Sequence, residues 1–351
     1  VAHALYRMFP VWFGGLRGGL ALGTIGLMVL IACMNGLSVA GMAIGATVAL
    51  PELLKHRYNK VMVTGVIQAG SSLGILVPPS VVLQLWLAGA IPGLLMAAFF
   101  AAYIYIRCRI NPELAPAMPK EEREAITPAE KFRLLGAGIL PLLVFVIMMG
   151  LFLSGITSLV ESAAVGALLS LLAAVFSGRF SLQVLEESTR NTLGISCMFL
   201  WIILAALCFG AVYDGLGAAR AIESLLLGQF GTDRWTVLIL MLLSFIILGM
   251  FLDDTAMLVI VAPLYIPLVI ALDFNPIWFG VLYTITCQIA YITPPFGYNL
   301  FLMRAMAPPE ITLGDIYRSI IPFVGLMGLM ILILMLFPDL ALWLPGWWTA
   351  R

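Results

Sequence analysis

Apolar runs and short polar segments alternate along the whole chain, and no stretch has the mixed composition of a separate water-soluble domain. Runs of this length pack as helices in a bilayer, where each backbone polar group must be satisfied within the segment. The pattern predicts an all-α, polytopic membrane protein. We place uninterrupted spans at about 91–106, 136–153, 158–176, 192–212 and 319–337.

Two apolar runs are interrupted by adjacent prolines, Pro78-Pro79 and Pro294-Pro295. Each pair removes two backbone donors and clashes with the preceding turn, so a helix must break there. We therefore expect two broken transmembrane helices, at 61–87 and 277–302. The plainer interpretation is that these prolines only kink packed helices.

The chain also matches itself at one fixed offset. The shift that aligns Pro51 with Pro267 needs no gaps, and it also superimposes the two proline pairs and aligns Asn59 with Asn275. Because four helix breakers coincide, we interpret the offset as an internal structural repeat, which in a transporter indicates where the binding site lies.

Each broken helix is preceded by two apolar arms joined at a polar tip, "NGLS" at 35–38 and "LDDT" at 252–255. Neither arm is long enough to cross a bilayer readily by itself with its polar ends in water. Each pair is therefore expected to form a re-entrant hairpin, at 20–54 and 235–271. Unwound backbone at membrane depth persists only where it is buried in protein or lines a cavity. Two tips and two breaks therefore predict one central transport site.

The basic residues test the orientation of the two halves. If each hairpin returns to its own side, fifteen Lys and Arg residues share one side of the membrane, and only Arg220, Arg234 and Arg351 lie on the other. This bias predicts that the first hairpin enters from the cytoplasm and the second from outside. The repeats are thus expected to be inverted.

Composition narrows the class of protein. The chain is 62% hydrophobic and 10% charged, with a mean hydropathy of +1.09 and a net charge of zero, so it offers no basic face for nucleic acid. Five scattered cysteines and two histidines in polar flanks argue against a disulfide framework and a zinc site. No HExxH, GxSxG or ATP-binding loop is present, which argues against an enzyme or a pump. No span carries enough regularly spaced polar residues along its length to line an ion channel.

Five stretches together resemble the large membrane subunit of tripartite ATP-independent periplasmic (TRAP) transporters, the DctM type. They are "GLSVAGMAIGATVALPELLKHRYNK", "AGSSLGILVPPS", "GITSLVESAAVGAL", "GMFLDDTAMLVIVAPLYIPLV" and "ITPPFGYNLFLMRAMAP". The resemblance implies a Na⁺-coupled elevator importer in the bacterial inner membrane. It also implies an organic acid substrate, commonly a C4-dicarboxylate, sugar acid or 2-oxo acid. The implied partners are a small four-helix membrane subunit (DctQ type) and a periplasmic substrate-binding protein (DctP type). About two further helices are expected before residue 1.

Polar residues at the tips and breaks supply candidate ligands, since neutral oxygens suit a hard cation such as Na⁺ that must also be released. For one Na⁺ between the first tip and break we expect Asn35, Ser38, Gly74 and Val77. For a second Na⁺ in the other repeat we expect Asp254, Thr255, Thr293 and Gly297. For the substrate carboxylate between them we expect Ser38, Ser71, Ser72 and Asn299.

These residues also have plainer interpretations. Ser38 and Asp254 could only cap the second hairpin arms, and the hydroxyls could bond only to carbonyls of their own helices. Ser158 and Glu161 form a capping-box pattern, and a structural role is preferred for them. The nearest rival function is a proton-coupled organic-anion carrier that works without a binding protein and uses Asp253 or Asp254 as its proton site.

The expected organisation has six parts. They are an amphipathic arm (1–19), a first-repeat transport region (20–106), a cytoplasmic connector (107–135), scaffold helices with a second arm (136–234), a second-repeat transport region (235–303) and a C-terminal span with its tail (304–351).

Overall fold

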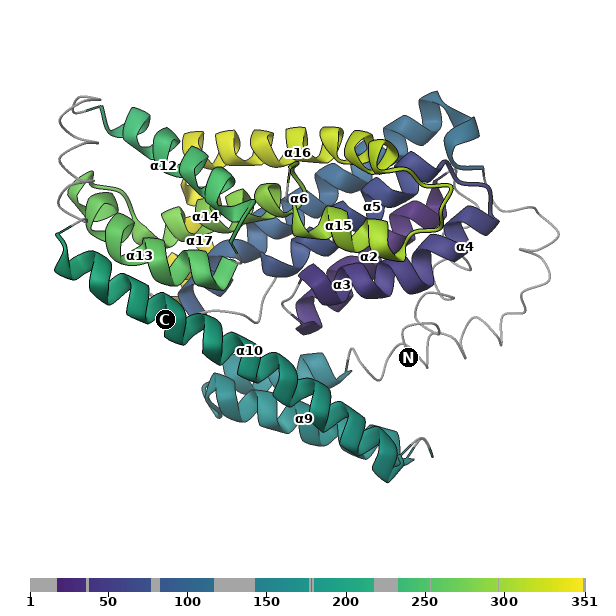
Figure 1. Ribbon diagram of the computed structural model, residues 1–351, viewed down its shortest axis with the longest axis horizontal. Helices are drawn as coiled ribbons and strands as arrows, with labels where there is room; N and C mark the ends of the chain where they lie inside the picture. The colour runs from purple at the N-terminus through teal and green to yellow at the C-terminus, as the bar shows by residue number, and fades with distance from the viewer. Residues whose placement is uncertain are drawn as a thin grey trace.

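The computed structural model describes residues 18–35, 38–76, 83–116, 143–176, 178, 180–217, 233–252, 254–295 and 297–349. Within these ranges the regular structure is entirely helical (Figure 1). Three helical stretches are long and apolar enough to cross a membrane, namely Leu87–Ile110, Leu182–Phe209 and Leu313–Leu336. Shorter apolar helices pack among them, as the hydropathy pattern predicts for a polytopic membrane protein.

The first helix pair folds back on itself. It consists of α2 (Gly19–Asn35), followed by α3 (Ser38–Ile44), the π-helical segment η1 (Gly45–Ala49) and α4 (Leu50–Lys55). The backbone N–H of Leu20 donates to the hydroxyl of Tyr58 at 3.4 Å, so the two ends of the pair lie together. Burial raises the pKa of Tyr58 to about 12, which keeps this hydroxyl neutral.

The second helix pair, α12 (Arg234–Gly249) and α13 (Asp254–Ala271), also folds back. Its arms are joined by a hydrogen bond of 2.9 Å between the hydroxyls of Ser244 and Tyr265. At the open end, the ring of Trp235 packs against Phe274 with centroids 5.3 Å apart. The described arms of both predicted hairpins therefore form antiparallel helix pairs, and their re-entrant insertion stays a prediction.

Each pair is followed by a helix that ends a few residues before its proline pair. In the first half, α5 (Lys60–Ser72) continues into the 3₁₀ segment η2 (Leu73–Ile75). In the second half, α14 (Pro276–Tyr291) stops, and α15 (Tyr298–Met306) resumes after a break that contains Pro294 and Pro295. Pro78 and Pro79 lie outside the described residues.

Helix capping repeats at the offset predicted from the sequence. The side-chain oxygen of Asn59 accepts from the N–H groups of residues 61 and 62, and that of Asn275 accepts from residues 277 and 278. α5 begins directly after Asn59, and α14 begins directly after Asn275. The aligned asparagines are therefore N-caps that start equivalent helices.

The preceding turns repeat as well. Arg57 and Asp273, which the same offset aligns, are the non-glycine residues with positive φ in the described chain, at 60° and 59°. The N–H of Tyr58 donates to Leu53, and the N–H of Phe274 donates to Val269, which ends each arm with a left-handed residue as in a Schellman motif. The internal repeat is thus present in the hydrogen bonding of the backbone.

The two second arms differ in one respect. The first arm includes η1, where the N–H of Leu50 bonds to Gly45 five residues earlier, whereas α13 is α-helical throughout. The hydroxyl of Thr47 donates to the carbonyl of Ala43 at 2.7 Å, next to the widened turn. π-Helical turns of this kind occur frequently near functional sites.

The boundary expected between a broken helix ending at 87 and a span beginning at 91 is wrong. One helix, α6 (Leu83–Ile110), runs through both with Pro92 inside it. Pro92 removes only one helical donor, and the residues one turn earlier are Ala88 and Gly89, whose small size leaves room for its ring. α6 also extends into the expected connector.

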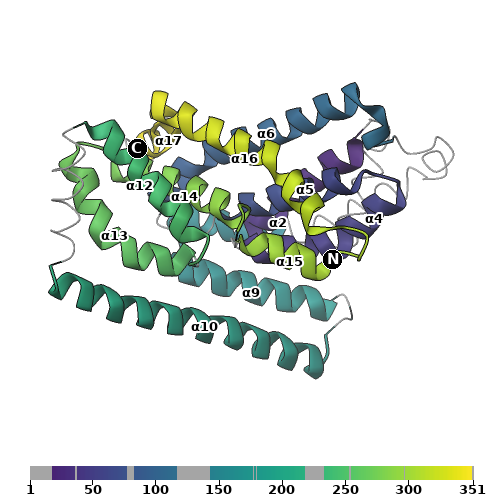
Figure 2. The same ribbon diagram turned by 45° about the horizontal axis from the view of Figure 1, so that its top comes forward.

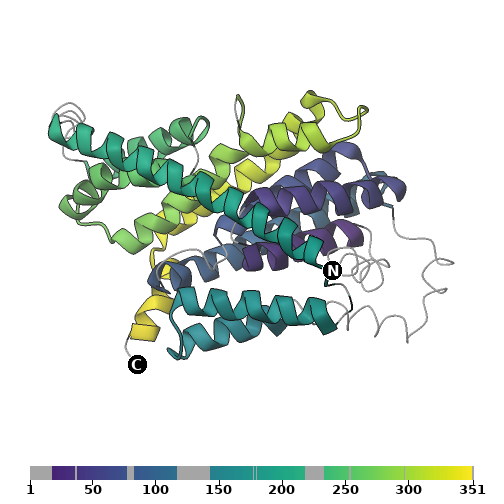
Figure 3. The same ribbon diagram turned by 60° about the horizontal axis from the view of Figure 1, so that its bottom comes forward.

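The remaining elements are long helices with short links. They are η3 (Pro112–Leu114), the helical residues 143–153, α9 (Leu159–Phe176), α10 (Leu182–Gly215), α16 (Leu313–Leu336) and α17 (Asp339–Thr349). α17 lies in the expected tail and packs against α6. α9 and α10 lie to one side of the body that α2–α6 and α12–α17 form, and α10 contacts α13 (Figures 2 and 3).

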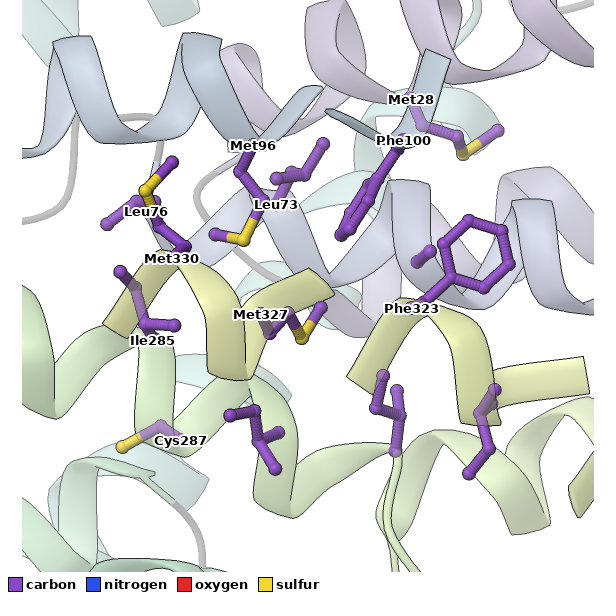
Figure 4. Packing of buried hydrophobic residues seen from close by; sticks show 14 of the residues in the cluster. Met28, Leu73, Leu76, Met96, Phe100, Ile285, Cys287, Phe323, Met327 and Met330 are labelled. Atoms are coloured by element: carbon purple, nitrogen blue, oxygen red, sulfur yellow. The ribbon is translucent and has the colours of Figure 1, made fainter. Parts of the chain in front are cut away.

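One apolar core joins the two halves of the sequence. Leu73 and Leu76 beside the first break lie among Met96 of α6, Ile285 of α14 and Met330 of α16 (Figure 4). Phe100 and Phe323 pack edge to face at 5.2 Å in the same core. Because side chains of both repeats interdigitate here, the core fixes η2 relative to α14 and α16.

Candidate functional site

The first tip and the second break meet through a direct hydrogen bond. The side-chain amide of Asn299, on the first turn of α15, donates to the hydroxyl of Ser38, the first residue of α3, at 2.6 Å. Both side chains are buried, with 1% of Asn299 and 4% of Ser38 exposed. Two residues that the sequence assigned to the substrate site are therefore in contact although they are 261 positions apart.

The end of α5 lies against the same tip. A Cβ atom on Gly41 of α3 would lie 3.3 Å from the Cα of Ser71, and α15 also contacts α5. Ser71 and Ser72 are buried, and their hydroxyls donate to the carbonyls of Gln68 and Ala69 at 2.9 and 2.8 Å. Their protons are used within the helix, as in the plainer interpretation, but both oxygens can still accept a hydrogen bond or bind a cation.

The second break places backbone carbonyls around a glycine. Gly297 donates its N–H to the carbonyl of Thr293 at 3.1 Å. A Cβ at Gly297 would lie 2.8 Å from the carbonyl oxygens of both Thr293 and Tyr291, so a glycine is required for this approach. The Thr293 hydroxyl donates to the carbonyl of Ile289. The break thus gathers oxygen atoms at the end of α14.

Other predicted ligands are only partly described. Gly74 is buried in η2, next to α2 and α3. Asn35 is the last residue of α2, and Asp254 and Thr255 are the first two residues of α13, but their side chains lie outside the description. Val77 and Asp253 fall outside the described residues. Asp254 and Ser38 occupy equivalent positions, since each begins the second arm of its pair.

Two buried glutamines were missed by the sequence reasoning. Gln68 and Gln288 are 0% exposed. Gln68 donates to the hydroxyl of Ser319 at 3.2 Å, while its own oxygen has no partner among the described residues. Neither polar atom of Gln288 has a partner there. A single amide within an apolar run was the available signal, because such a group must find a partner once it is buried.

The described site is electrically neutral. At the junction, the oxygen of Asn299 is buried without a partner in the described structure, and Ser38, Ser71 and Ser72 contribute hydroxyl groups. Within the described ranges, no three His, Cys, Asp or Glu residues gather as a metal site. The amide oxygen of Asn299, the hydroxyls and the carbonyls of the break are oxygen ligands of the kind that bind a hard monovalent cation, and a hydroxyl can also donate to a carboxylate.

Glu161 has the structural role expected for it. Its carboxylate accepts from the backbone N–H of Ser158 at 2.7 Å, and the Ser158 hydroxyl accepts from the N–H of Glu161 at 3.3 Å. This reciprocal pair is a capping box at the start of α9, and both residues are exposed.

Comparison with known proteins agrees with this architecture. The family described as tripartite ATP-independent periplasmic transporter, DctM component, matches residues 1–340. The C4-dicarboxylate TRAP transporter large permease protein DctM of Pseudomonas aeruginosa is 30% identical, over 99% of this chain and 82% of that protein.

Two relatives carry other substrate names. The sialic acid TRAP transporter large permease protein SiaM of Vibrio cholerae is 27% identical, over 98% of this chain and 82% of that protein. The isethionate TRAP transporter permease protein DctMQ of Oleidesulfovibrio alaskensis is 26% identical, over 99% of this chain and 55% of that protein. The chain therefore belongs to the DctM component family of tripartite ATP-independent periplasmic transporters, which are multi-pass membrane transport proteins and not enzymes.

Proposed function

We propose that this chain is the permease subunit through which an organic acid enters a bacterial cell, driven by Na⁺ and delivered by a periplasmic substrate-binding protein. A small four-helix membrane subunit would complete the complex in the inner membrane. Relatives named for C4-dicarboxylate, sialic acid and isethionate support an organic anion as the cargo. One relative is named DctMQ, which combines the names of the large and small subunits, and this supports the small membrane subunit as a partner.

The hydrogen bond between Ser38 and Asn299 is the observation that carries the proposal. It joins the tip of one repeat to the interrupted helix of the other, where irregular backbone is buried in protein. Irregular segments at the interface of two repeats are where secondary transporters bind substrate and coupling ion. The unpartnered oxygen of Asn299 leaves an acceptor at this junction.

The oxygen atoms described at the junction support a hard cation such as Na⁺ as the coupling ion. Inward movement of an anion against a negative interior costs about 2.3 kcal/mol per charge per 100 mV, so cations must accompany it. Na⁺ binds amide and hydroxyl oxygens, and these are the described buried polar groups at the junction. Ser38 for the first Na⁺ and Thr293 for the second are the described side chains that would bind the coupling ions, while Asn299 would contact the substrate.

The shared core supports an elevator movement. Because α5, α6, α14 and α16 interdigitate in one core, a movement of one repeat against the other would expose buried apolar surface. A movement of both helix pairs and both interrupted helices as a block, against α9 and α10, keeps that core intact. The re-entrant and inverted insertion of the two pairs belongs to the same proposal.

Uptake by proteoliposomes that contain the complete complex tests the proposal. The organic acid is first identified as the ligand of the periplasmic binding protein. We expect uptake with an inward Na⁺ gradient and its loss when Na⁺ is replaced by K⁺. Uptake that persists in K⁺ and follows an inward pH gradient would instead establish the proton-coupled carrier.

Two variants connect the transport reaction to the site. Asn299→Ala is expected to reduce uptake strongly, because it removes the amide at the junction. Asn275→Ser is the matched control, since serine retains the N-cap of α14 at the far end of the same interrupted helix. Equal uptake by both variants would remove Asn299 from the transport site.

A further inference from the structure

A cavity of about 330 Å³ lies between the end of α6 and the beginnings of α5 and α16, away from the site described above. Its lining includes Asn59, Tyr103, Arg107, Arg318, Ile321 and Phe323. Its lining residues come from α6, α16 and the first turn of α5. The cavity shares no lining residue with the junction of Ser38 and Asn299, although the hydroxyl of Ser319, which lines the cavity, accepts from the buried amide of Gln68.

The charge in this cavity is positive and unpaired. Arg107 lies in the last turn of α6 and Arg318 in the second turn of α16, and both are exposed. Neither forms a salt bridge within the described part of the chain. Asp315 is three residues before Arg318 on α16, but it pairs with Lys60 at 2.7 Å. No carboxylate is among the described lining residues.

The rest of the lining is mostly apolar. Val61, Met62, Ile104 and Pro322 line the cavity, and the ring of Tyr103 packs against Phe323 at 5.4 Å. Ile321, at the rim, is 67% exposed. Since α16 is long and apolar enough to cross a membrane, this exposed side chain would face lipid. A charged end and an apolar end therefore lie within one cavity.

The depth of the two arginines agrees with the polar surface of a bilayer. Arg318 is five residues from the start of α16, about 7.5 Å along its axis. Arg107 is three residues from the end of α6, about 4.5 Å. The positive-inside bias predicts that both lie on the cytoplasmic side, and basic pockets between transmembrane helices on that side bind anionic lipid headgroups.

We propose that this cavity binds an anionic phospholipid of the phosphatidylglycerol type. The guanidinium groups of Arg107 and Arg318 contact the phosphate, for which the planar fork of arginine is well suited. The acyl chains leave over the rim at Ile321 and lie against the outer face of α16. The lipid thereby joins α6 to α16 at the cytoplasmic end, where helices from the two halves of the repeat meet.

Lipid binding to the purified complex tests the proposal independently of transport. The complex with the full-length subunit is stripped of lipid in detergent and titrated with dioleoyl phosphatidylglycerol, and bound lipid is counted by native mass spectrometry. We expect one tight site. Each arginine contributes about fivefold in affinity, so Arg107→Gln combined with Arg318→Gln should weaken it about 25-fold.

Arg109→Gln is the matched control, because Arg109 is exposed in the same last turn of α6 but does not line the cavity. It should retain the tight site. Dioleoyl phosphatidylcholine tests the headgroup charge, and sn-glycerol 1-phosphate tests whether the acyl chains are needed. Equal binding of phosphatidylcholine, equal loss in Arg109→Gln, or displacement of the lipid by glycerol phosphate at similar concentration would each overturn the proposal.

Discussion

The hydrogen bond between Ser38 and Asn299 predicts a measurable coupling between the two halves of the chain. Ser38→Ala removes the acceptor of the Asn299 amide, which lies 2.6 Å away. Since Asn299 is 1% exposed and its oxygen already lacks a described partner, the mutation leaves the whole amide unsatisfied. An orphaned buried donor costs about 1–3 kcal/mol, and we expect a loss of that size in the free energy of unfolding.

Asn299→Ala should also be destabilising, but the double variant should lose less than the sum of the two single losses. Once the amide is absent, removal of the Ser38 hydroxyl no longer leaves it unpaired. Contacting residues of this kind give interaction energies of about 0.5–3 kcal/mol. Reversible unfolding by SDS in mixed micelles, followed by circular dichroism, measures the four free energies.

Ser72 provides the control for this cycle. Its hydroxyl is as buried as that of Ser38 but bonds to Ala69 in its own helix. Ser72→Ala and Asn299→Ala should therefore add to within about 0.5 kcal/mol. If Ser38→Ala and Asn299→Ala are equally additive, the contact between the first tip and the second break does not contribute to the stability of the fold.

Three further predictions use the same unfolding assay. Arg57→Gly should be about 1 kcal/mol more stable than Arg57→Ala, because φ is 60° there and a Cβ is unfavourable in the left-handed region; equal stability of the two variants would contradict this explanation of the turn. Gly65→Ala should lose about 1–3 kcal/mol, since its Cβ would lie 2.8 Å from the ring of Phe323 and still closer to the carbonyl of Ser319. Gly325→Ala on α16, with nothing within 4 Å of the new Cβ, should lose nothing, and a similar loss at both positions would refute the packing argument. Gln288→Leu should leave the free energy of unfolding unchanged or higher, because it replaces a buried amide that has no described partner. In proteoliposomes, this variant should take up less substrate than the wild type. Unchanged uptake would mean that Gln288 has no part in transport.

The repeat could be predicted from the sequence because its markers act locally. Asn59 and Asn275 cap the helices that follow them, and α14 ends at Tyr291, just before Pro294 and Pro295. Such residues determine where elements begin and end without tertiary help. One fixed offset therefore applies to helix starts, turn residues and caps, although few other side chains match.

Other features depend on packing and could not be predicted in the same way. α6 continues through Pro92, where Ala88 and Gly89 leave room for the ring, although a proline by itself favours a break. Several hydroxyls of the candidate set could have accepted from the amide of Asn299. That the acceptor is Ser38 depends on how α3 and α15 pack. Gln68 and Gln288 were overlooked because an amide in an apolar run becomes informative only when its burial and partners are known.

The widened turn η1 means that the two tips are not copies of one another. From Ser38 to Asn59 and from Asp254 to Asn275 the chain has the same number of residues, but only the first of these two segments contains a π-helical turn. One residue accommodated in such a turn shifts the angular register of the helix by about 100°. Positions 38 and 254 are thus equivalent along the chain but lie at different angles around their helix axes. Any ligands bound at the two tips would accordingly meet different surroundings, so duplication of the backbone need not produce two sites of equal affinity.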